Sequence, residues 1–399
     1  MHQSLHNAER LDRWLDRGDI LHPAAPGHLA FTDLMAVVLT AAGLPTPFRP
    51  EGTALAEAVG TPEHLVFVLV DGLGVPIIED WAPEAGVLRR QMFQSCRAVF
   101  PSATASALTT VASGRWPGAH GITGWWTFLP DHDLTFEPLP WRLMNTREQA
   151  TLSPNALFRV PSVFEQVPRS VCTVTPTGLA DSIYSGWSAG DTDILGYENW
   201  DDAIDQLLAR IRRASGPTLT WWYLPEFDRH GHMAGVSHKK TGRIVRRLDQ
   251  ALSHLESSLP RNTRVVLTAD HGHINAHPEG DHILDADDPL LRHLAAPPSG
   301  EPVCPHFHLK DGQRKAFIDE FSSRFDGLFT LFDVEALVQR GVYGPDLDAV
   351  VRARLGDLVA LSLEARTLRV RTGTRPPNVL KGLHGGLTPA EMLIPVVLF

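Results

Sequence analysis

The run His64-Leu-Val-Phe-Val-Leu-Val-Asp71 decides the fold class, because it is almost continuously apolar and ends in an acid followed by glycine. Such a run predicts a short strand buried on both faces of a parallel sheet, with its carboxyl end delivering the acid to a loop. Three further runs have a similar pattern: Cys96–Phe100 before Pro101, Leu219–Leu224 before an acidic loop, and Arg264–Asp270.

Helical stretches separate these runs, notably Thr104–Ser113 and Asp202–Arg213. Strands that alternate with helices predict an α/β fold with a doubly wound, mostly parallel sheet and helices on both faces. Ligands of such sheets bind beyond the carboxyl ends of the strands, which is where Asp71 and Asp270 fall.

The chain divides into three expected regions. Residues 1–54 form a helical N-terminal lead-in, residues 55–289 with 376–399 form the α/β core, and residues 290–375 form an inserted α+β cap. The cap is expected to hold a strand at Val303–Leu309 and helices at Gln313–Phe325 and Asp333–Arg340, and the core to close with a strand at Met392–Phe399.

Composition excludes several classes of protein. With 43% hydrophobic and 21% charged residues the chain is globular, and its net charge of −10 argues against a nucleic-acid polymer as partner. Its 3 cysteines form no CxxC pair, so neither a thiolate zinc site nor a disulfide framework is expected. The N-terminus lacks the apolar segment of a secretory signal, and no early apolar stretch is long enough to span a bilayer. We therefore expect a cytoplasmic protein with no membrane partner; the oligomeric state has no signal in the sequence.

Five polar clusters fall in expected loops: Asp71, Phe100-Pro-Ser-Ala-Thr-Ala-Ser106, Asp228-Arg-His-Gly-His232, Asp270-His271-Gly and His384-Gly-Gly. Their carboxylates and imidazoles are ligands that Zn²⁺, Mn²⁺ or Fe takes, and they suffice for two neighbouring ions with a hydroxyl between them. A hydroxyl at a helix N-terminus beside a metal becomes a nucleophile near neutral pH. Taken singly, each cluster also has a structural explanation, such as a helix cap or a solvated pair on one helix face.

Together with His120-Gly-Ile122, these motifs resemble the alkaline-phosphatase superfamily, and most closely its nucleotide pyrophosphatase/phosphodiesterase branch. The resemblance covers about residues 64–281 and 382–399. The segment His384-Gly-Gly-Leu-Thr-Pro-Ala-Glu-Met-Leu-Ile-Pro395 also resembles the end of PglZ-type domains.

The resemblance implies a site for two divalent metal ions, with zinc favoured and manganese or iron as alternatives. One metal is assigned to Asp228, His232 and His384, and the other to Asp71, Asp270, His271 and the nucleophile hydroxyl. That nucleophile is Thr104, because it stands ten residues before Gly114, which is the family's spacing. Ser102 and Ser106 are the neighbouring alternatives.

Two departures from the branch concern the substrate. Ala105 stands where the branch has Phe after the nucleophile, and Thr123-Gly-Trp-Trp126 replaces an Asn that holds a phosphoryl oxygen. Trp125, Trp126 and the cation Arg142 are the candidate substrate-binding residues.

The resemblance implies a two-metal-dependent phosphoric ester hydrolase that acts on a small phosphorylated substrate through a phospho-threonine intermediate. A phosphodiesterase or nucleotide pyrophosphatase is favoured. The alternatives are a phosphomonoesterase or phosphonate hydrolase, a phosphoglycerate-mutase-like isomerase, and a non-catalytic PglZ-like interaction module.

Overall fold

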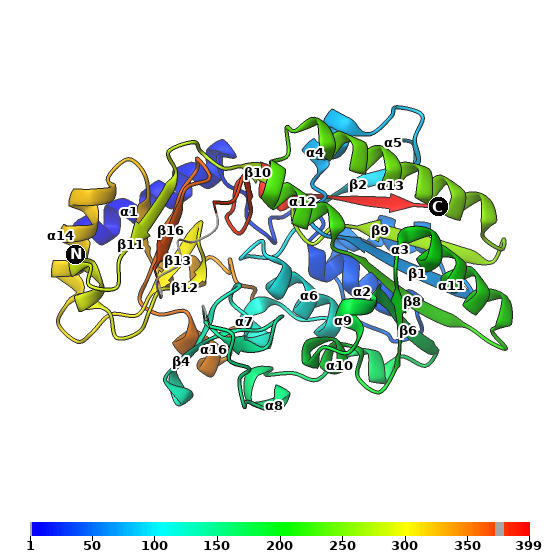
Figure 1. The fold of residues 1–399 in the computed structure, drawn as a ribbon, viewed down its shortest axis with the longest axis horizontal. Helices are drawn as coiled ribbons and strands as arrows, with labels where there is room; N and C mark the ends of the chain where they lie inside the picture. Colours follow the sequence, from blue (N-terminus) through cyan, green and yellow to red (C-terminus); the bar gives the residue numbers. More distant parts are fainter. Residues whose placement is uncertain (1, 145, 372–378) are drawn as a thin grey trace.

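A computed structural model of the chain describes residues 2–144, 146–371 and 379–399, with side chains from residue 8 onward. Figure 1 shows two parts: a wide sheet flanked by helices on the right, where the chain ends, and a smaller region of strands with helix α14 (Arg314–Phe325) on the left. No helix of the described residues is both long enough and apolar enough to cross a membrane.

The wide sheet has 7 strands. In order across the sheet they are β2 (Met92–Arg97), β18 (Leu393–Leu398), β9 (Thr263–Thr268), β1 (His64–Val70), β8 (Thr218–Leu224), β6 (Ser170–Pro176) and β7 (Asp193–Tyr197). Only β18 runs antiparallel to its neighbours, so the sheet is mostly parallel and the α/β fold class is confirmed.

Strand β1 lies at the centre of this sheet, and all of its residues are buried, as its apolar run predicts. It pairs in parallel with β8 and β9, with Val70 opposite Leu224 and Leu69 opposite Thr268. The loops that follow these three strands therefore leave the sheet at one edge, and this register brings Asp71 and Asp270 together.

Helices cover both faces of the sheet in two groups, each held by mutual contacts. One group comprises α2 (Phe31–Ala41), α3 (Thr53–Val59), α6 (Thr104–Ser113) and α10 (Ile183–Ala189); the other comprises α4 (Val75–Trp81), α11 (Trp200–Arg213), α12 (Glu226–Ala234) and α13 (Lys239–Ser258). Helix α11 begins where the Asn199 side chain accepts hydrogen bonds from the N–H groups of Asp201 and Asp202.

The smaller region is built on a 4-stranded sheet and has an apolar core of its own. Its strands are β12 (Ser299–Glu301), β13 (Cys304–Phe307), β15 (Leu358–Leu361) and β14 (Thr330–Asp333). Phe317 and Phe321 of α14 pack on Phe307 of β13. Helix α1 (His2–Arg17) also packs here, with the Trp14 ring 5.5 Å from that of Phe332.

The expected lead-in thus contacts the expected cap through α1. The proposed division of the chain at residues 54, 289 and 376 stays a prediction, and residues 372–378, which include its last boundary, lie outside the described residues.

Short strands complete the surroundings of the site. They are β3 (Thr127–Leu129), β4 (Leu134–Glu137), β5 (Arg142–Leu143), β10 (Ile274–Asn275), β17 (Gly382–Leu383), β11 (Asp281–Leu284) and β16 (Thr367–Val370). The antiparallel pair β10–β17 brings the residues before His384 beside the loop that follows β9, more than a hundred residues earlier in the chain.

Candidate active site

Three carboxylates gather at the carboxyl edge of the sheet. Asp71 follows β1 and Asp270 follows β9, and both are buried; Asp228 lies in the first turn of α12, just after β8. Among the described residues, the only ion-pair partners of these carboxylates are histidines. Burial, together with the charges of Asp270 and Asp228, raises the pKa of Asp71 well above its usual value. Buried carboxylates without a Lys or Arg partner are stabilised when a cation binds to them, so this edge is a candidate metal site.

Three imidazoles at this edge, those of His232, His271 and His384, share one orientation, in which Nδ1 contacts a backbone carbonyl. The contacts are His232 to Gly382 at 2.8 Å, His271 to Gly272 at 3.0 Å and His384 to Ser102 at 3.0 Å. A carbonyl oxygen only accepts hydrogen bonds, so Nδ1 carries a proton, and when such a ring is neutral its Nε2 presents a lone pair. This arrangement is typical of metal-ligating histidines.

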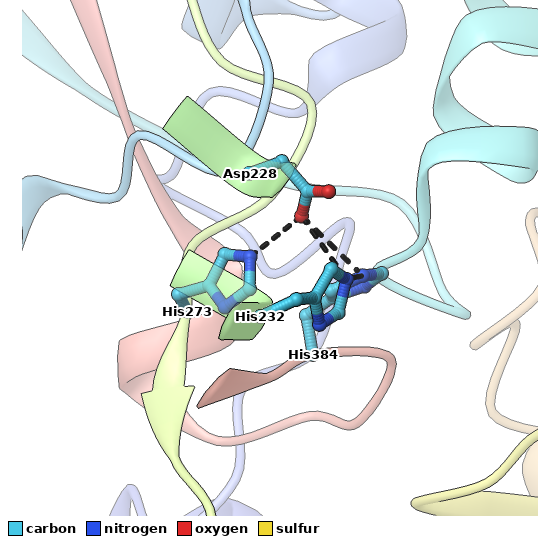
Figure 2. A group of neighbouring side chains, drawn as sticks. All are labelled: Asp228, His232, His273 and His384. Atoms are coloured by element: carbon cyan, nitrogen blue, oxygen red, sulfur yellow. Dashed lines mark hydrogen bonds and ion pairs between the residues drawn. The ribbon is translucent and has the colours of Figure 1, made fainter. Parts of the chain in front are cut away.

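The first group of candidate metal ligands comprises Asp228, His232, His273 and His384. In this group, the Nε2 atoms of the histidines converge on one oxygen of Asp228 (Figure 2). Nε2 of His232 lies 3.3 Å from Asp228 Oδ1, and Nε2 of His384 lies 3.7 Å from it. The two Nε2 atoms are 3.1 Å apart. When Nδ1 carries the only proton of both rings, the two Nε2 lone pairs face each other and repel unless a cation lies between them.

His273 belongs to the same group, although the sequence reasoning did not count it as a ligand. Its Nε2 lies 2.6 Å from Asp228 Oδ1, while its buried Nδ1 has no hydrogen-bond partner. The ring fills a slot that requires glycine at position 72, where a Cβ atom would stand 2.6 Å from the ring. Burial lowers the pKa of His273 to about 4, so the ring is neutral. The feature of the sequence that could have indicated His273 as a ligand is its position two residues after His271.

The second group comprises Asp71, Asp270 and His271. Asp270 Oδ1 accepts hydrogen bonds from the N–H groups of Gly72 and His271, both at 2.9 Å, but its buried Oδ2 has no hydrogen-bond partner. Nε2 of His271 lies 3.4 Å from both Asp270 Oδ2 and Asp71 Oδ1. An orphaned carboxylate oxygen beside an imidazole lone pair fits a divalent cation.

Thr104 is the first residue of α6 and contacts the second group. Its Oγ1 lies 3.2 Å from His271 Nε2 and 3.4 Å from Asp71 Oδ1. The two alternative hydroxyls are engaged elsewhere: Ser102 donates to the carbonyl of Gly386 at 2.7 Å, and Ser106 donates to that of Ile122 at 3.1 Å. Thr104 therefore presents its hydroxyl to the ligand group, whereas the two serines hold neighbouring loops.

Two further groups at the site were not expected from the sequence. The Tyr223 hydroxyl donates to Asp71 Oδ2 at 2.5 Å; this tyrosine lies inside the apolar run of β8, so nothing in the pattern marked it. Glu301 arrives on β12, where its Oε1 accepts a hydrogen bond from the N–H of Trp125 at 2.5 Å. Burial raises the pKa of Glu301 to about 8.

Two cavities meet at Thr104, and Trp125 and Asp228 line both of them. The cap-side cavity, of about 390 Å³, is also lined by Trp126, Ala276, Asp281, Glu301, Val303, Leu380 and His384. The core-side cavity, of about 300 Å³, is also lined by Leu139, Thr173, Leu179, Ser185, Trp221 and Tyr223.

Two of the three candidate substrate-binding residues line a cavity at Thr104. Trp125 and Trp126 line the cap-side cavity, but Arg142 lines neither cavity. The Arg142 guanidinium instead pairs with Glu137 at 2.5 Å, and Glu137 also accepts a hydrogen bond from Trp126 Nε1 at 3.2 Å. The hairpin of β4 and β5 thus directs this cation to a partner inside the chain, and a role of Arg142 as a clamp on the substrate stays a prediction.

A mostly parallel α/β sheet with these groups at its carboxyl edge is the arrangement that the sequence resemblance to the alkaline-phosphatase superfamily implies. Within that class, the model of the family "Type I phosphodiesterase / nucleotide pyrophosphatase" matches residues 65–386. The chain belongs to this family and is a phosphoric ester hydrolase.

Solved structures with the same fold include both vertebrate and bacterial enzymes. Murine ectonucleotide pyrophosphatase/phosphodiesterase 5, as an inactive variant with AMP, has a TM-score of 0.63 at 17% identity, over 84% of this chain and 87% of that one. The human protein of that name gives 0.64 at 15% identity, with 84% and 87% covered. Phosphonoacetate hydrolase from Sinorhizobium meliloti 1021, with phosphonoformate, gives 0.59 at 18% identity, with 84% and 90% covered. A search of curated protein sequences found no match.

Proposed function

We propose that this protein is a two-metal-dependent phosphodiesterase that cleaves small phosphorylated molecules through a covalent intermediate on Thr104. Asp228, His232 and His384 would hold one ion, with His273 as a fourth ligand or as the donor that orients Asp228. Asp71, Asp270 and His271 would hold the other ion beside Thr104. The separation of 3.1 Å between the Nε2 atoms of His232 and His384 is the observation that carries this proposal.

The donor set favours zinc, because mixed imidazole and carboxylate ligands suit it, with manganese or iron as alternatives. Divalent ions here would lower the pKa of the attacking hydroxyl and neutralise charge on the phosphoryl and leaving oxygens.

The Thr104 hydroxyl loses its proton to solvent as its oxygen attacks phosphorus, a Thr–O–P bond forms, and the P–O bond to the leaving group breaks, which releases an alkoxide that takes up a proton from solvent. Water then cleaves the phospho-threonine and restores the hydroxyl. In-line attack requires the Thr104 oxygen to be held still. The position of Thr104 at the start of α6 would provide this, and the free N–H groups of the first helical turn could donate hydrogen bonds to the phosphoryl oxygens.

The two cavities support a diester in preference to a monoester. A diester carries an organic group on each side of phosphorus, and Thr104 has a cavity on each side of it, whereas a monoester would occupy only one. The net charge of −10 supports a small substrate over a nucleic-acid polymer. The cytoplasmic location stays a prediction.

The test measures metal content and substrate choice together. Elemental analysis of protein loaded with Zn²⁺ or Mn²⁺ is expected to give two ions per chain. Bis(4-nitrophenyl) phosphate is expected to be hydrolysed at least about tenfold faster, in kcat/KM, than 4-nitrophenyl phosphate or a phosphonate. Preference for the monoester or the phosphonate would overturn the diesterase proposal, and two bound ions without any turnover would favour an interaction module.

A further inference from the structure

The first half of helix α13 carries a high density of positive charge. Five of the nine residues from 239 to 247 are Lys or Arg, in a chain whose net charge is −10. They are Lys239, Lys240, Arg243, Arg246 and Arg247, and all five are exposed. Helical spacing puts positions 239, 243 and 246 in one row and positions 240, 243 and 247 in the next. The five side chains therefore share one side of the helix, which we call the cationic face of α13.

The cationic face has no counter-charges of its own. None of its five side chains forms an ion pair with another residue of the described chain, although Arg247 lies over the Trp200 ring at 5.5 Å. Like charges three and four residues apart destabilise a helix. Lys239 and Lys240 also stand in the first turn, where the helix dipole disfavours cations. An anion bound to this face would offset both costs.

The cationic face borders a third cavity, of about 350 Å³, which we call the outer cavity. Helix α13 packs against α11 and α12 (Figure 1), and the outer cavity is lined by Trp200 of α11, Arg229 of α12 and Arg247 of α13. Arg229 also lines the core-side cavity, together with Thr104 and Asp228. Because the two cavities share Arg229 as a wall, they form a route from the nucleophile to the cationic face.

Arg229 is exposed and has no ion-pair partner among the described residues. Glu226 lies three residues earlier on α12, a spacing that favours an ion pair. However, Glu226 Oε1 accepts a hydrogen bond from the Tyr197 hydroxyl at 3.0 Å, and its Oε2 is buried. Asp228 contacts the histidines of the first ligand group instead, and of the two acids that line the outer cavity only Glu198 is exposed. The Arg229 guanidinium is therefore available to an anion from outside the chain.

We propose that the substrate carries a further anionic group, such as a second phosphate, which Arg229, Arg247 and the cationic face bind while the scissile phosphoryl group lies at Thr104. A guanidinium binds a phosphate through two parallel hydrogen bonds. The cationic face spans about 12 Å of helix, which suits one or two phosphate groups of a small molecule. The net charge of the chain disfavours a polymer. This inference rests on the proposed function for the position of the phosphoryl group, and it adds the charge of one arm of the substrate.

The test measures binding to the zinc-loaded protein by calorimetry. It compares linear bisphosphonates, with a phosphonate at each end of an alkyl chain from propane to octane, with n-alkylphosphonates of the same length. At the best length, the bisphosphonate is expected to bind the wild type at least about tenfold more tightly. Arg229→Gln and Arg247→Gln are each expected to reduce this ratio to about threefold or less.

Two further variants serve as controls. Arg261→Gln removes the same charge from an exposed position beyond the far end of α13 that lines none of the three cavities, and it is expected to leave the ratio unchanged. Arg229→Lys keeps the charge but not the two parallel donors, and it is expected to retain part of the preference.

The absence of a bisphosphonate preference in the wild type at every chain length would overturn the inference. So would an unchanged ratio in Arg229→Gln or Arg247→Gln, or an equal loss in Arg261→Gln. Tighter binding of a single-stranded oligonucleotide than of any bisphosphonate would also overturn it, because the face would then serve a polymer. Turnover of bis(4-nitrophenyl) phosphate is measured separately: its absence, with the bisphosphonate preference intact, would overturn the proposed function alone.

Discussion

In His232, His271 and His384, a contact of Nδ1 with a backbone carbonyl orients the proposed ligating nitrogen on the other side of the ring. In His384, the contact of Nδ1 with the Ser102 carbonyl orients Nε2 toward Asp228. Burial, with the neighbouring His271, lowers the pKa of His384 well below its usual value, so the ring stays neutral and able to bind a cation. The protein thus fixes the tautomer through its own backbone.

Replacement of one ligand is expected to remove one ion. His384→Ala should bind one ion fewer than the wild type by elemental analysis, and its kcat/KM on a diester should fall about a thousandfold. His230→Ala is a matched control, because His230 lies on α12 near His232 but lines neither cavity at the nucleophile. Full metal content in His384→Ala would contradict the assignment.

The buried Glu301 predicts a pH-dependent stability for the metal-free protein. Its pKa of about 8 lies above the unfolded value near 4.5, so the folded state holds a proton that the unfolded state releases between these pH values. The contribution of the protonated Glu301 to the unfolding free energy is therefore fully present below about pH 4.5 and decreases as the pH rises toward 8.

Glu301→Gln should abolish this dependence. The unfolding free energy of the wild type, relative to the variant, should fall by at most about 1.4 kcal/mol per pH unit across this window. Chemical denaturation at several pH values measures it, and parallel curves for the two proteins would contradict the prediction.

At the scale of elements, helix α17 (Pro389–Met392) holds the loop that carries His384. Its capping residue Thr388 and the buried Glu391 bond each other, and Glu391 Oε1 also accepts a hydrogen bond from the N–H of Gly386 at 2.7 Å. Glu391 therefore links the start of a helix to a residue two positions after a proposed metal ligand.

Glu391→Ala should cost about 1–3 kcal/mol of unfolding free energy, because the N–H groups that it satisfies are buried. Glu391→Gln, which keeps one acceptor, should cost less. Denaturant unfolding measures the unfolding free energies of both variants. Equal stability of Glu391→Ala and the wild type would show that the hydrogen bonds of Glu391 at the start of α17 do not hold this loop.

The elements that sequence reasoning found are those with strong local signals. The apolar runs before Asp71 and Asp270 predicted β1 and β9. The motifs at the ends of these runs, with Asp228-Arg-His-Gly-His232 and His384-Gly-Gly, contain the predicted ligands that the structure brings into two groups. Strands β6 and β7 were not predicted, because buried threonines such as Thr173 interrupt the apolar pattern of β6. The strand expected at 96–100 lies earlier, at β2.

The parts of the site that were missed depend on distant contacts. Glu301 reaches Trp125 only because the β12 backbone pairs with Trp126, more than a hundred residues away in sequence. The pairing of Arg142 with Glu137 was not predicted, because a free cation and a paired cation look the same in a sequence.

At the scale of the whole molecule, the proposed ions would change the charge balance. Two divalent ions would move the net charge of −10 to −10 + 4 = −6 and would make the mouth of the site locally positive. A small anionic substrate would then be attracted to one point of an otherwise acidic protein.

Metal removal should therefore destabilise the whole fold, since the three carboxylates would lose their counter-charges. At a free metal concentration about a hundred times Kd, the ions should contribute about 3 kcal/mol per site. Calorimetric melting with and without a chelator measures this, and re-addition of Zn²⁺ should restore the melting temperature. An unchanged melting temperature would argue against bound ions.

The most direct test of the central claim is the identification of the covalent intermediate. Metal-loaded protein is mixed with bis(4-nitrophenyl) phosphate and quenched in acid within the first turnover, and its peptides are mapped by mass spectrometry. We predict a 4-nitrophenyl phosphoryl group on Thr104, and none in Thr104→Ala, which should lose diester turnover while Ser106→Ala keeps its activity. Wild-type turnover by Thr104→Ala with metals saturating, or the adduct on another residue, would contradict the mechanism.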